Sequence, residues 1–123
     1  MRFMIIRKAD KSTEAGVPPS KEVFQAMMQY NDDMTKAGVF RDGVGLKPSS
    51  KGARVTFAGG KPTVTDGPFT ETKELIAGFT MIETGSMAEA ISWVKRWPRE
   101  DRDVELEIRP LFEPEDFGDL LKG

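Results

Sequence analysis

The chain has 123 residues, 38% of them hydrophobic, and a formal net charge of −2 from 18 basic and 20 acidic side chains. This length suits one domain whose single core buries roughly two-thirds of the unfolded surface. Charges of both signs are interspersed, which argues against direct binding of nucleic acid. No apolar run approaches the roughly 18–20 residues that cross a bilayer, and the start does not resemble a signal peptide. We therefore expect a cytoplasmic protein without a membrane segment.

Cysteine and histidine are both absent. Their absence excludes a disulfide framework, a Ser-His-Asp triad, a Cys/His zinc site and a His-ligated haem. A metal would need oxygen ligands, and Asp32, Asp33 and Asp42 lack the spacing of a calcium loop. The sequence thus predicts no metal and no redox cofactor.

The first third of the chain predicts a strand, a loop and a helix. Residues 2–8 are apolar on both faces with charged ends, which is typical of a central strand. Residues 10–19 are rich in turn formers and predict a loop. Apolar residues then recur every three or four positions, from a helix cap at Ser20 to Gly38, which suits the position after a helix end.

The middle of the chain predicts strands separated by glycines. Residues 39–48 indicate a strand with a bulge near its glycines. Strands at 54–57 and 62–65 flank Gly59-Gly60, which is a hairpin signal.

The last third predicts a strand, a helix and a strand. Residues 76–83 indicate the first strand, and a capping box at Ser86 and Glu89 begins a helix. Residues 104–111 alternate apolar and charged side chains. The whole order predicts an α+β, ferredoxin-like βαββαβ fold with an inserted β-hairpin. Two helices can cover only one face of its sheet, so the other face must meet water or another chain.

The stretch from Asp66 to Glu74 reads Asp-Gly-Pro-Phe-Thr-Glu-Thr-Lys-Glu. It closely resembles the signature of the DGPF subfamily of YCII-related proteins, which are small bacterial proteins with a ferredoxin-like fold. The resemblance covers nearly the whole chain, which divides into a domain at residues 1–112 and an acidic tail at 113–123. Matching segments outside the signature are Met4, Met28, Tyr30, Lys36-Ala37-Gly38, Gly45-Leu46-Lys47-Pro48, Ala77-Gly78-Phe79 and Glu107-Ile108-Arg109-Pro110.

The resemblance implies a homodimer of the dimeric α+β barrel type, in which two sheets face each other. It also implies an association with extracytoplasmic-function sigma factors. Broader YCII-related proteins are thought to use a histidine–aspartate pair, which this chain lacks. In the tail, Phe117, Leu120 and Leu121 are candidate docking residues.

The signature holds the first set of candidate site residues. The Asp66 carboxylate could accept backbone N–H bonds in its turn, or act as a general base in a pocket that raises its pKa. Glu71 and Lys73 could handle a proton and hold an anion, or simply decorate an exposed turn. Phe69 is interpreted as a hydrophobic plug rather than a stacking platform.

Two further sets lie elsewhere. Tyr30 and Asp33 are three residues apart on a helix and could orient a ligand, or belong to its polar outer face. Arg109 could clamp an anion as part of a sheet-face set. That set comprises Arg7, Glu105, Glu107 and Arg109, for which cross-strand ion pairing is the simpler interpretation.

Two functions remain open from the sequence. One is a small-ligand-binding or regulatory module with a sigma-factor-related protein partner. The other is a cofactor-independent enzyme with Asp66 as base, Glu71 as a second proton-handling group, and Lys73 or Arg109 as an anion clamp.

Overall fold

The computed structural model describes residues 1–101 and 103–122, without the side chains of Thr72, Leu121 and Lys122. A four-stranded antiparallel sheet has the order β2-β5-β1-β6. Its strands are β1 (Arg2–Lys8), β2 (Phe40–Gly45), β5 (Ile76–Glu83) and β6 (Leu106–Pro110). A second sheet contains β3 (Ala53–Ala58) and β4 (Lys61–Asp66).

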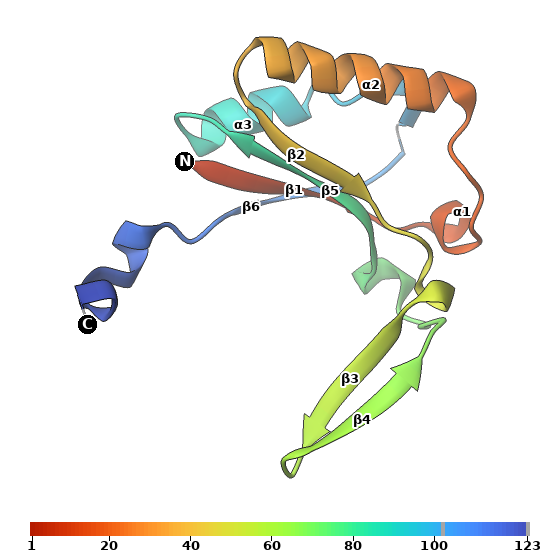
Figure 1. The fold of residues 1–123 in the computed structure, drawn as a ribbon. Coiled ribbons are helices and arrows are strands. Elements are labelled where there is room, and N and C mark those ends of the chain that lie inside the picture. The colour runs from red at the N-terminus through yellow and green to blue at the C-terminus, as the bar shows by residue number, and fades with distance from the viewer. Residues whose placement is uncertain (102, 123) are drawn as a thin grey trace.

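The helices are α1 (Lys11–Glu14), α2 (Lys21–Lys36) and α3 (Met87–Val94). Short 3-10 helices are η1 (Ser49–Lys51), η2 (Thr72–Glu74), η3 (Arg99–Asp101) and η4 (Pro114–Lys122). Figure 1 shows α2 and α3 on one face of the four-stranded sheet, while the β3–β4 hairpin and the C-terminal segment extend away from it. In the described part of the chain, no helix combines the length and the apolar character that crossing a membrane requires.

The core lies between the sheet and the two longer helices. Its fully buried large side chains are Phe3, Ile5, Met34 and Ile82. Trp97, which follows α3, is also buried and meets the ring of Tyr30 edge-on, with centroids 5.6 Å apart. Alternate residues of β1 face this core because successive side chains of a strand point to opposite sides.

The predicted helix ends are confirmed. The Ser20 hydroxyl accepts a hydrogen bond from the N–H of Val23, and Ser86 does the same for Glu89. Gly38 follows α2 with a φ of 77°, a conformation that a side chain would disfavour. Gly59 and Gly60 both have positive φ and form the hairpin turn.

Three details differ from expectation. The predicted loop at residues 10–19 contains α1, because Asp10 and Thr13 form a reciprocal cap that satisfies two backbone N–H groups. Phe24 and Met28 on α2 are exposed rather than core residues. Arg7 points to the helix-covered face, opposite to Glu107 and Arg109, because it shares the alternation of Phe3 and Ile5.

The signature turn packs against the chain just before the hairpin. The N–H of Gly67 donates to the carbonyl of Gly52 at 3.0 Å, and the N–H of Phe69 donates to Ser49 Oγ at the same distance. Ser49 in turn donates to both carboxylate oxygens of Glu14, from its N–H at 3.1 Å and from its hydroxyl at 2.5 Å. The base of the hairpin is thereby fastened to the end of α1.

The C-terminal segment is attached to β1 at its start. Arg2 donates from Nε and Nη2 to the two oxygens of Glu113, at 3.0 and 3.1 Å. Beyond this pair, the rings of Phe112 and Phe117 lie with centroids 5.3 Å apart. Leu120 is exposed, and the docking role predicted for Leu121 falls on a side chain outside the described residues.

Candidate functional site

A cleft of about 510 Å³ lies between the N-terminal part of α2, the α1 region and the end of the sheet. Its size falls within the roughly 300–1,000 Å³ typical of small-molecule sites. Apolar side chains supply much of its wall: Val17, Pro18, Pro19, Val23, Leu46, Pro48 and Ala77. Charged groups enter it from three segments, namely Arg7, Asp10 and Asp101. An apolar cleft with a few convergent polar groups is the common form of a ligand site.

Arg7 is the centre of the charged group. Its Nη2 donates to Asp101 Oδ1 at 2.6 Å and its Nε to Asp101 Oδ2 at 3.1 Å. The indole N–H of Trp97 donates to Asp101 Oδ2 at 3.1 Å. Both charged side chains are only 15% exposed. Asp101, held by three donors, keeps Arg7 fixed and raises the pKa of its guanidinium, chiefly through their hydrogen bonds.

Asp10 is the more accessible carboxylate. Its Oδ1 accepts from the N–H of Thr13 at 2.8 Å, and its Oδ2 lies 3.4 Å from Arg7 Nη1. The hydrogen bond from Thr13 is the main cause that lowers the pKa of Asp10, with a smaller contribution from the charge of Arg7. The Asp10 side chain is 44% exposed and its contact with Arg7 is long, so the carboxylate is accessible to a ligand.

A second hollow of about 250 Å³, here called the inner chamber, adjoins the cleft between α2 and the sheet. The two cavities share Arg7, Gly45, Ala77 and Asp101 as lining residues. Helix α2 lines the chamber with Met27 and Asn31, and the sheet forms the opposite wall with residues of β2 and β5. The cleft and the chamber are therefore adjacent hollows above the helix-covered face of the sheet.

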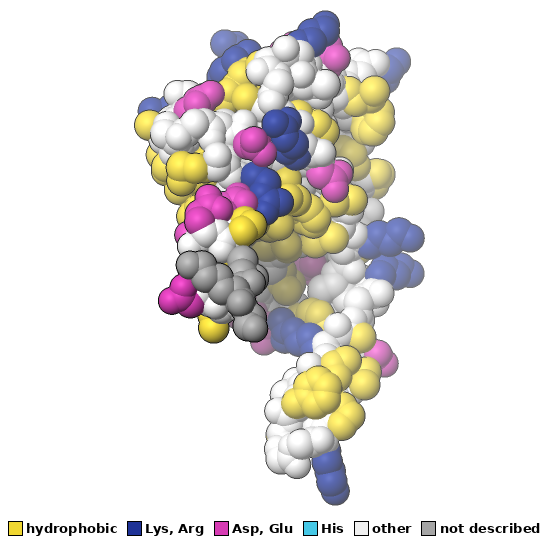
Figure 2. Space-filling model, turned by 60° about the vertical axis from the view of Figure 1, so that its left-hand side comes forward, with side chains coloured by type: hydrophobic (Ala, Val, Ile, Leu, Met, Phe, Trp, Pro, Cys, Tyr) yellow, Lys and Arg dark blue, Asp and Glu magenta, His cyan; other side chains and the backbone are white. Residues whose placement is uncertain are grey.

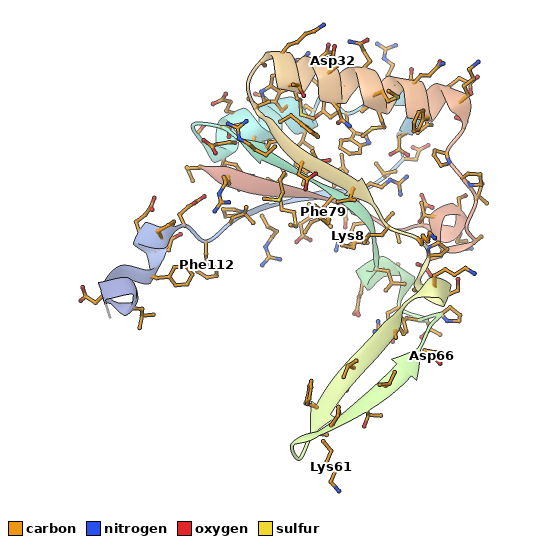
Figure 3. The ribbon with its side chains drawn as sticks, viewed as in Figure 1. Lys8, Asp32, Lys61, Asp66, Phe79 and Phe112 are labelled. Atoms are coloured by element: carbon orange, nitrogen blue, oxygen red, sulfur yellow. The ribbon has the colours of Figure 1, made fainter. Side chains whose placement is uncertain are left out.

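The candidate residues of the signature lie outside this space. Asp66 is exposed at the end of β4, and Figure 3 shows it where the hairpin joins the body, with Lys61 at the tip. Glu71 accepts from Arg54 Nη2 at 3.1 Å and is exposed to solvent. Its pKa is lowered, first by its own backbone N–H and then by Arg54. Arg54 also lies 3.8 Å from the centre of the Phe69 ring.

Lys73 lies nearer to the cleft. It lines a separate hollow of about 370 Å³ together with Lys8, Asp10 and Glu105. Asp10 thus borders both the cleft and this hollow. Among the three candidate residues of the signature, Asp66, Glu71 and Lys73, it is Lys73 that the structure places beside a carboxylate of the cleft.

The other candidates are dispersed. Tyr30 is buried, and its hydroxyl donates to the backbone carbonyl of Trp93 at 2.5 Å. Burial raises its pKa to about 12. Asp33 accepts from Gln29 instead of pairing with Tyr30. Arg109 is on the open face of the sheet, where it donates to Glu107 at 3.1 Å.

Asp10, Asp101 and Asn31 were not among the residues predicted for a site, and Arg7 was expected on the opposite face of the sheet. Asp10 had a visible signal, because an opposite charge, Arg7, precedes it by three residues. Asp101 had none, since it lies in a sign-mixed charged run that is typical of a solvated connection.

The strand order and the position of the helices define the class of fold. Antiparallel strands in the order β2-β5-β1-β6, with two helices on one face, define an α+β domain of the ferredoxin-like class. Residues 1–113 match the YCII-related domain. The chain belongs to the YCII-related family.

Two relatives extend this placement. An uncharacterised protein of Rhizobium meliloti (strain 1021), R00369, is 34% identical over 67 residues. That match covers 54% of this chain and 54% of that protein, so the chain spans about half the length of this curated relative. A solved structure of 5-chloro-2-hydroxyhydroquinone dehydrochlorinase (TftG) from Burkholderia phenoliruptrix AC1100, in complex with 2,5-dihydroxybenzoquinone, is similar with a TM-score of 0.52. It is 17% identical, and the match covers 94% of this chain and 98% of that one, which shows a shared fold.

Proposed function

We propose that the protein binds a small organic molecule in the cleft above the sheet and transforms it by proton transfer, without a redox cofactor. The observation that carries this proposal is the convergence of Arg7, Asp10 and Asp101 at one end of an otherwise largely apolar cleft. Such a cleft desolvates the ligand, so its polar contacts are stronger than in water.

The cluster of Arg7, Asp10 and Asp101 suggests a different role for each charge. One guanidinium faces two carboxylates, so Asp10 Oδ2 remains an acceptor for a ligand O–H. Asp10 would take the proton, and the fixed cation of Arg7 would stabilise the negative charge left on the ligand. Because the pKa of Asp10 is lowered, it is a weak base. It suits a proton that is already acidic, such as the hydroxyl of a ring that also bears carbonyl groups.

A fold-level likeness supports this ligand class. TftG, which shares the fold, acts on a chlorinated hydroxyhydroquinone and was solved with a dihydroxybenzoquinone. We propose the same broad class, hydroxylated rings, for this chain. The support for this class is the similarity of the two folds, together with a largely apolar cleft that carries a few charged residues.

A binding screen tests the proposal. Hydroxylated aromatic acids, hydroxyquinones and non-aromatic hydroxy acids would be screened by amide NMR against the wild-type protein and a Gly45→Val variant. The added side chain would occupy the cleft, because a Cβ at Gly45 meets nothing within 4 Å. Binding that shifts Arg7, Asp10 and Ala77 signals and is lost in Gly45→Val supports the cleft. Hits that persist in the variant would move the site elsewhere.

Asp66 remains a rival base from the sequence. Once a substrate is known, Asp10→Asn and Asp66→Asn separate the two assignments. We expect Asp10→Asn to lower kcat by about a hundredfold or more, as general acid–base effects typically do, and Asp66→Asn to retain turnover. The opposite pattern would assign the chemistry to the signature turn.

We also propose a homodimer of the dimeric α+β barrel type, with the hairpin as an insertion in the ferredoxin-like order. The face of the sheet opposite the helices bears Met4, Ile6, Phe79 and Met81, by strand alternation and register. Their side chains remain half-buried in the single chain. Packing this face against its twin would remove them from water.

A regulatory role is our second proposal, and one observation favours it. On one face of the hairpin, Val55 pairs with Val64 and Phe57 pairs with Pro62, and Phe57 is 73% exposed. Figure 2 shows hydrophobic side chains gathered on the projecting hairpin. Such a surface suits a protein partner. On the signature we place the chain in the DGPF subfamily, whose association with sigma factors implies a cytoplasmic partner in transcription control.

Co-purification distinguishes this role. A partner lost on Phe57→Ser, but retained in Gly45→Val, would assign regulation to the hairpin. Turnover of a cleft ligand without any such partner would reject it.

A further inference from the structure

We propose that the inner chamber is a recognition pocket for one flat ring bearing a hydroxyl group, with Asn31 and Thr80 as the residues that recognise that hydroxyl. This inference rests on the proposed function of the cleft and names the part of the ligand that enters deepest. It depends on three features of the chamber: a floor in which glycines predominate, and two polar groups without a hydrogen-bond partner among the described residues.

The floor follows from strand register. On the helix-covered face, one row across β2, β5 and β1 contains Gly43, Thr80 and Ile5, and the next contains Gly45, Gly78 and Arg7. Three of these six positions are glycines, so the β2 side of the sheet presents mostly backbone to α2. Gly78 is required by the fold, since a Cβ there would lie 2.7 Å from the carbonyl oxygen of Val44.

Gly43 and Gly45 are not required in this way. A Cβ at Gly43 would make only ordinary contacts, the nearest at 3.4 Å from Phe40, and a Cβ at Gly45 would meet nothing within 4 Å. Neither glycine has a positive φ. Packing and backbone conformation therefore leave Gly45 open to larger residues and allow a small side chain at Gly43. The effect of the two glycines is to keep this part of the floor low.

Asn31 supplies the first polar group, from the helix side. Its Oδ1 is buried and has no hydrogen-bond partner among the described residues. An unsatisfied buried acceptor costs about 1–3 kcal/mol. A ligand O–H or N–H in the chamber would satisfy it, and so would a water molecule in the empty protein.

Thr80 supplies the second polar group, from the floor. The residue is only 6% exposed and lines the chamber. Its Oγ1 would lie 3.7 Å from a Cβ built at Gly43, so the hydroxyl stands over the glycine floor. It makes no side-chain hydrogen bond to the described residues, whereas Thr84, equally buried, donates to the carbonyl of Ser86 at 2.8 Å.

These features select a ligand class. The chamber's volume of about 250 Å³ is below the range of pockets for drug-sized ligands, so it suits one ring. A flat ring fits between the glycine floor and Met27, whose thioether interacts favourably with aromatic rings. A ring hydroxyl can donate to Asn31 Oδ1 and accept from the Thr80 hydroxyl. The opposite edge of the ring then faces Arg7 and Asp101, which line both the chamber and the cleft.

Phenol and toluene test the inference, because they differ by a hydroxyl in place of a methyl group of similar size. Dissociation constants would be measured by amide NMR for the wild type, Asn31→Leu, Thr80→Val and Gly45→Val. Gln25→Leu is the matched control, since Gln25 is an exposed amide on the same helix. Thermal unfolding of each variant shows that it is folded.

In the wild type and Gln25→Leu, we expect phenol to bind more tightly than toluene. Asn31→Leu and Thr80→Val should each weaken phenol about three- to tenfold, the value of one hydrogen bond, and leave toluene nearly unchanged. Gly45→Val should remove binding of both compounds. Equal affinities of phenol and toluene in the wild type, or a phenol preference that survives both polar substitutions, would overturn the inference.

The outcome is separable from that of the proposed function. If the wider screen finds ligands that Gly45→Val excludes but that ignore Asn31 and Thr80, the cleft function stands and this pocket assignment is wrong. If no compound enters the cleft at all, both are wrong.

Discussion

Arg7 of the central strand and Asp101 of η3 are joined by two hydrogen bonds, of 2.6 and 3.1 Å, in a pair that is 15% exposed on each side. The pair ties the sheet to the segment that follows α3. It also forms the boundary between the outer cleft and the inner chamber, because both residues line both cavities. The same two side chains therefore connect parts of the fold and line both cavities of the proposed site.

Asp101→Asn should destabilise the fold by about 2–4 kcal/mol, because it leaves the largely buried guanidinium of Arg7 with only its longer contact to Asp10 as counter-charge. The check is urea denaturation followed by tryptophan fluorescence. Glu100→Gln is the control, since Glu100 is an exposed neighbour in η3, and it should stay within about 0.5 kcal/mol of the wild type. Equal stability of the two variants would show that the pair contributes no stability.

Stability should fall in acid partly through Asp10. Its folded pKa is lowered, mainly by the N–H of Thr13, from an ordinary value of 3.8. A depressed carboxyl pKa contributes stability that is present above the unfolded pKa and is lost as the pH falls through the folded pKa. Asp10→Asn keeps a capping side chain but removes this titration. Its unfolding free energy, measured from pH 5 to pH 2, should decline less steeply than that of the wild type; parallel curves would contradict the prediction.

Tyr30 is the only tyrosine in the chain, so its ionisation can be followed directly by absorbance. Burial raises its pKa to about 12, from 10.0. The stability that follows from this raised pKa is fully present below about pH 10 and is lost as the pH rises toward 12. The folded protein should form tyrosinate near pH 12, and the protein unfolded in urea near pH 10.

Tyr30→Phe removes one hydrogen bond, to the carbonyl of Trp93, and should cost about 1–2 kcal/mol. We expect no effect on ligand binding in the cleft. A selective loss of binding, without loss of stability, would return Tyr30 to the ligand-binding role predicted from the sequence.

Two glycines offer a matched test of steric requirement. A Cβ at Gly67 would lie 1.7 Å from the carbonyl oxygen of Ser49, whereas one at Gly45 has open space. Gly67→Ala should displace the hairpin base and cost roughly 1–3 kcal/mol or more, the range for overpacking. Gly45→Ala should fold as well as the wild type. Limited proteolysis at the hairpin, together with thermal unfolding, distinguishes the two.

The apolar side chains on the open face of the sheet predict that two copies of the chain associate through it. Sedimentation velocity should show a dimer for the wild type and a monomer for Met81→Glu, which places a charge in the centre of the apolar face. Phe57→Ser, on the hairpin, should remain dimeric. A wild-type protomer that stays single at micromolar concentration would reject the face as a dimer interface.

The sequence was sufficient for most elements because their signals are local. The capping serines, Gly38 and the glycine pair of the hairpin each act within a few residues, so their effects can be predicted from the local sequence. Residues 10–19 were expected to be a loop because α1 is one turn long and is held by a cap rather than by apolar periodicity.

The cleft could not be foreseen because it depends on contacts between distant segments. Both faces of β1 are apolar, so its pattern does not tell which face the helices cover, and Arg7 was placed on the wrong one. Gly45 and Gly78 were visible as single residues, but their alignment across β2 and β5 exists only in the paired sheet. Thr80 and Asn31 read as ordinary polar positions, since nothing in a sequence shows that a side chain lacks a partner.

The bare backbone at Gly43 and Gly45 has a practical consequence. Gly43 and Gly45 on β2 set the width of the cavity, whereas its charge comes from Arg7 on β1 and from Asp10 and Asp101. Graded replacements of Gly45, from alanine to valine to leucine, would narrow the space stepwise while Arg7, Asp10 and Asp101 stay intact. Size selectivity and reactivity could then be tuned independently, which makes this small domain a convenient scaffold for directed evolution.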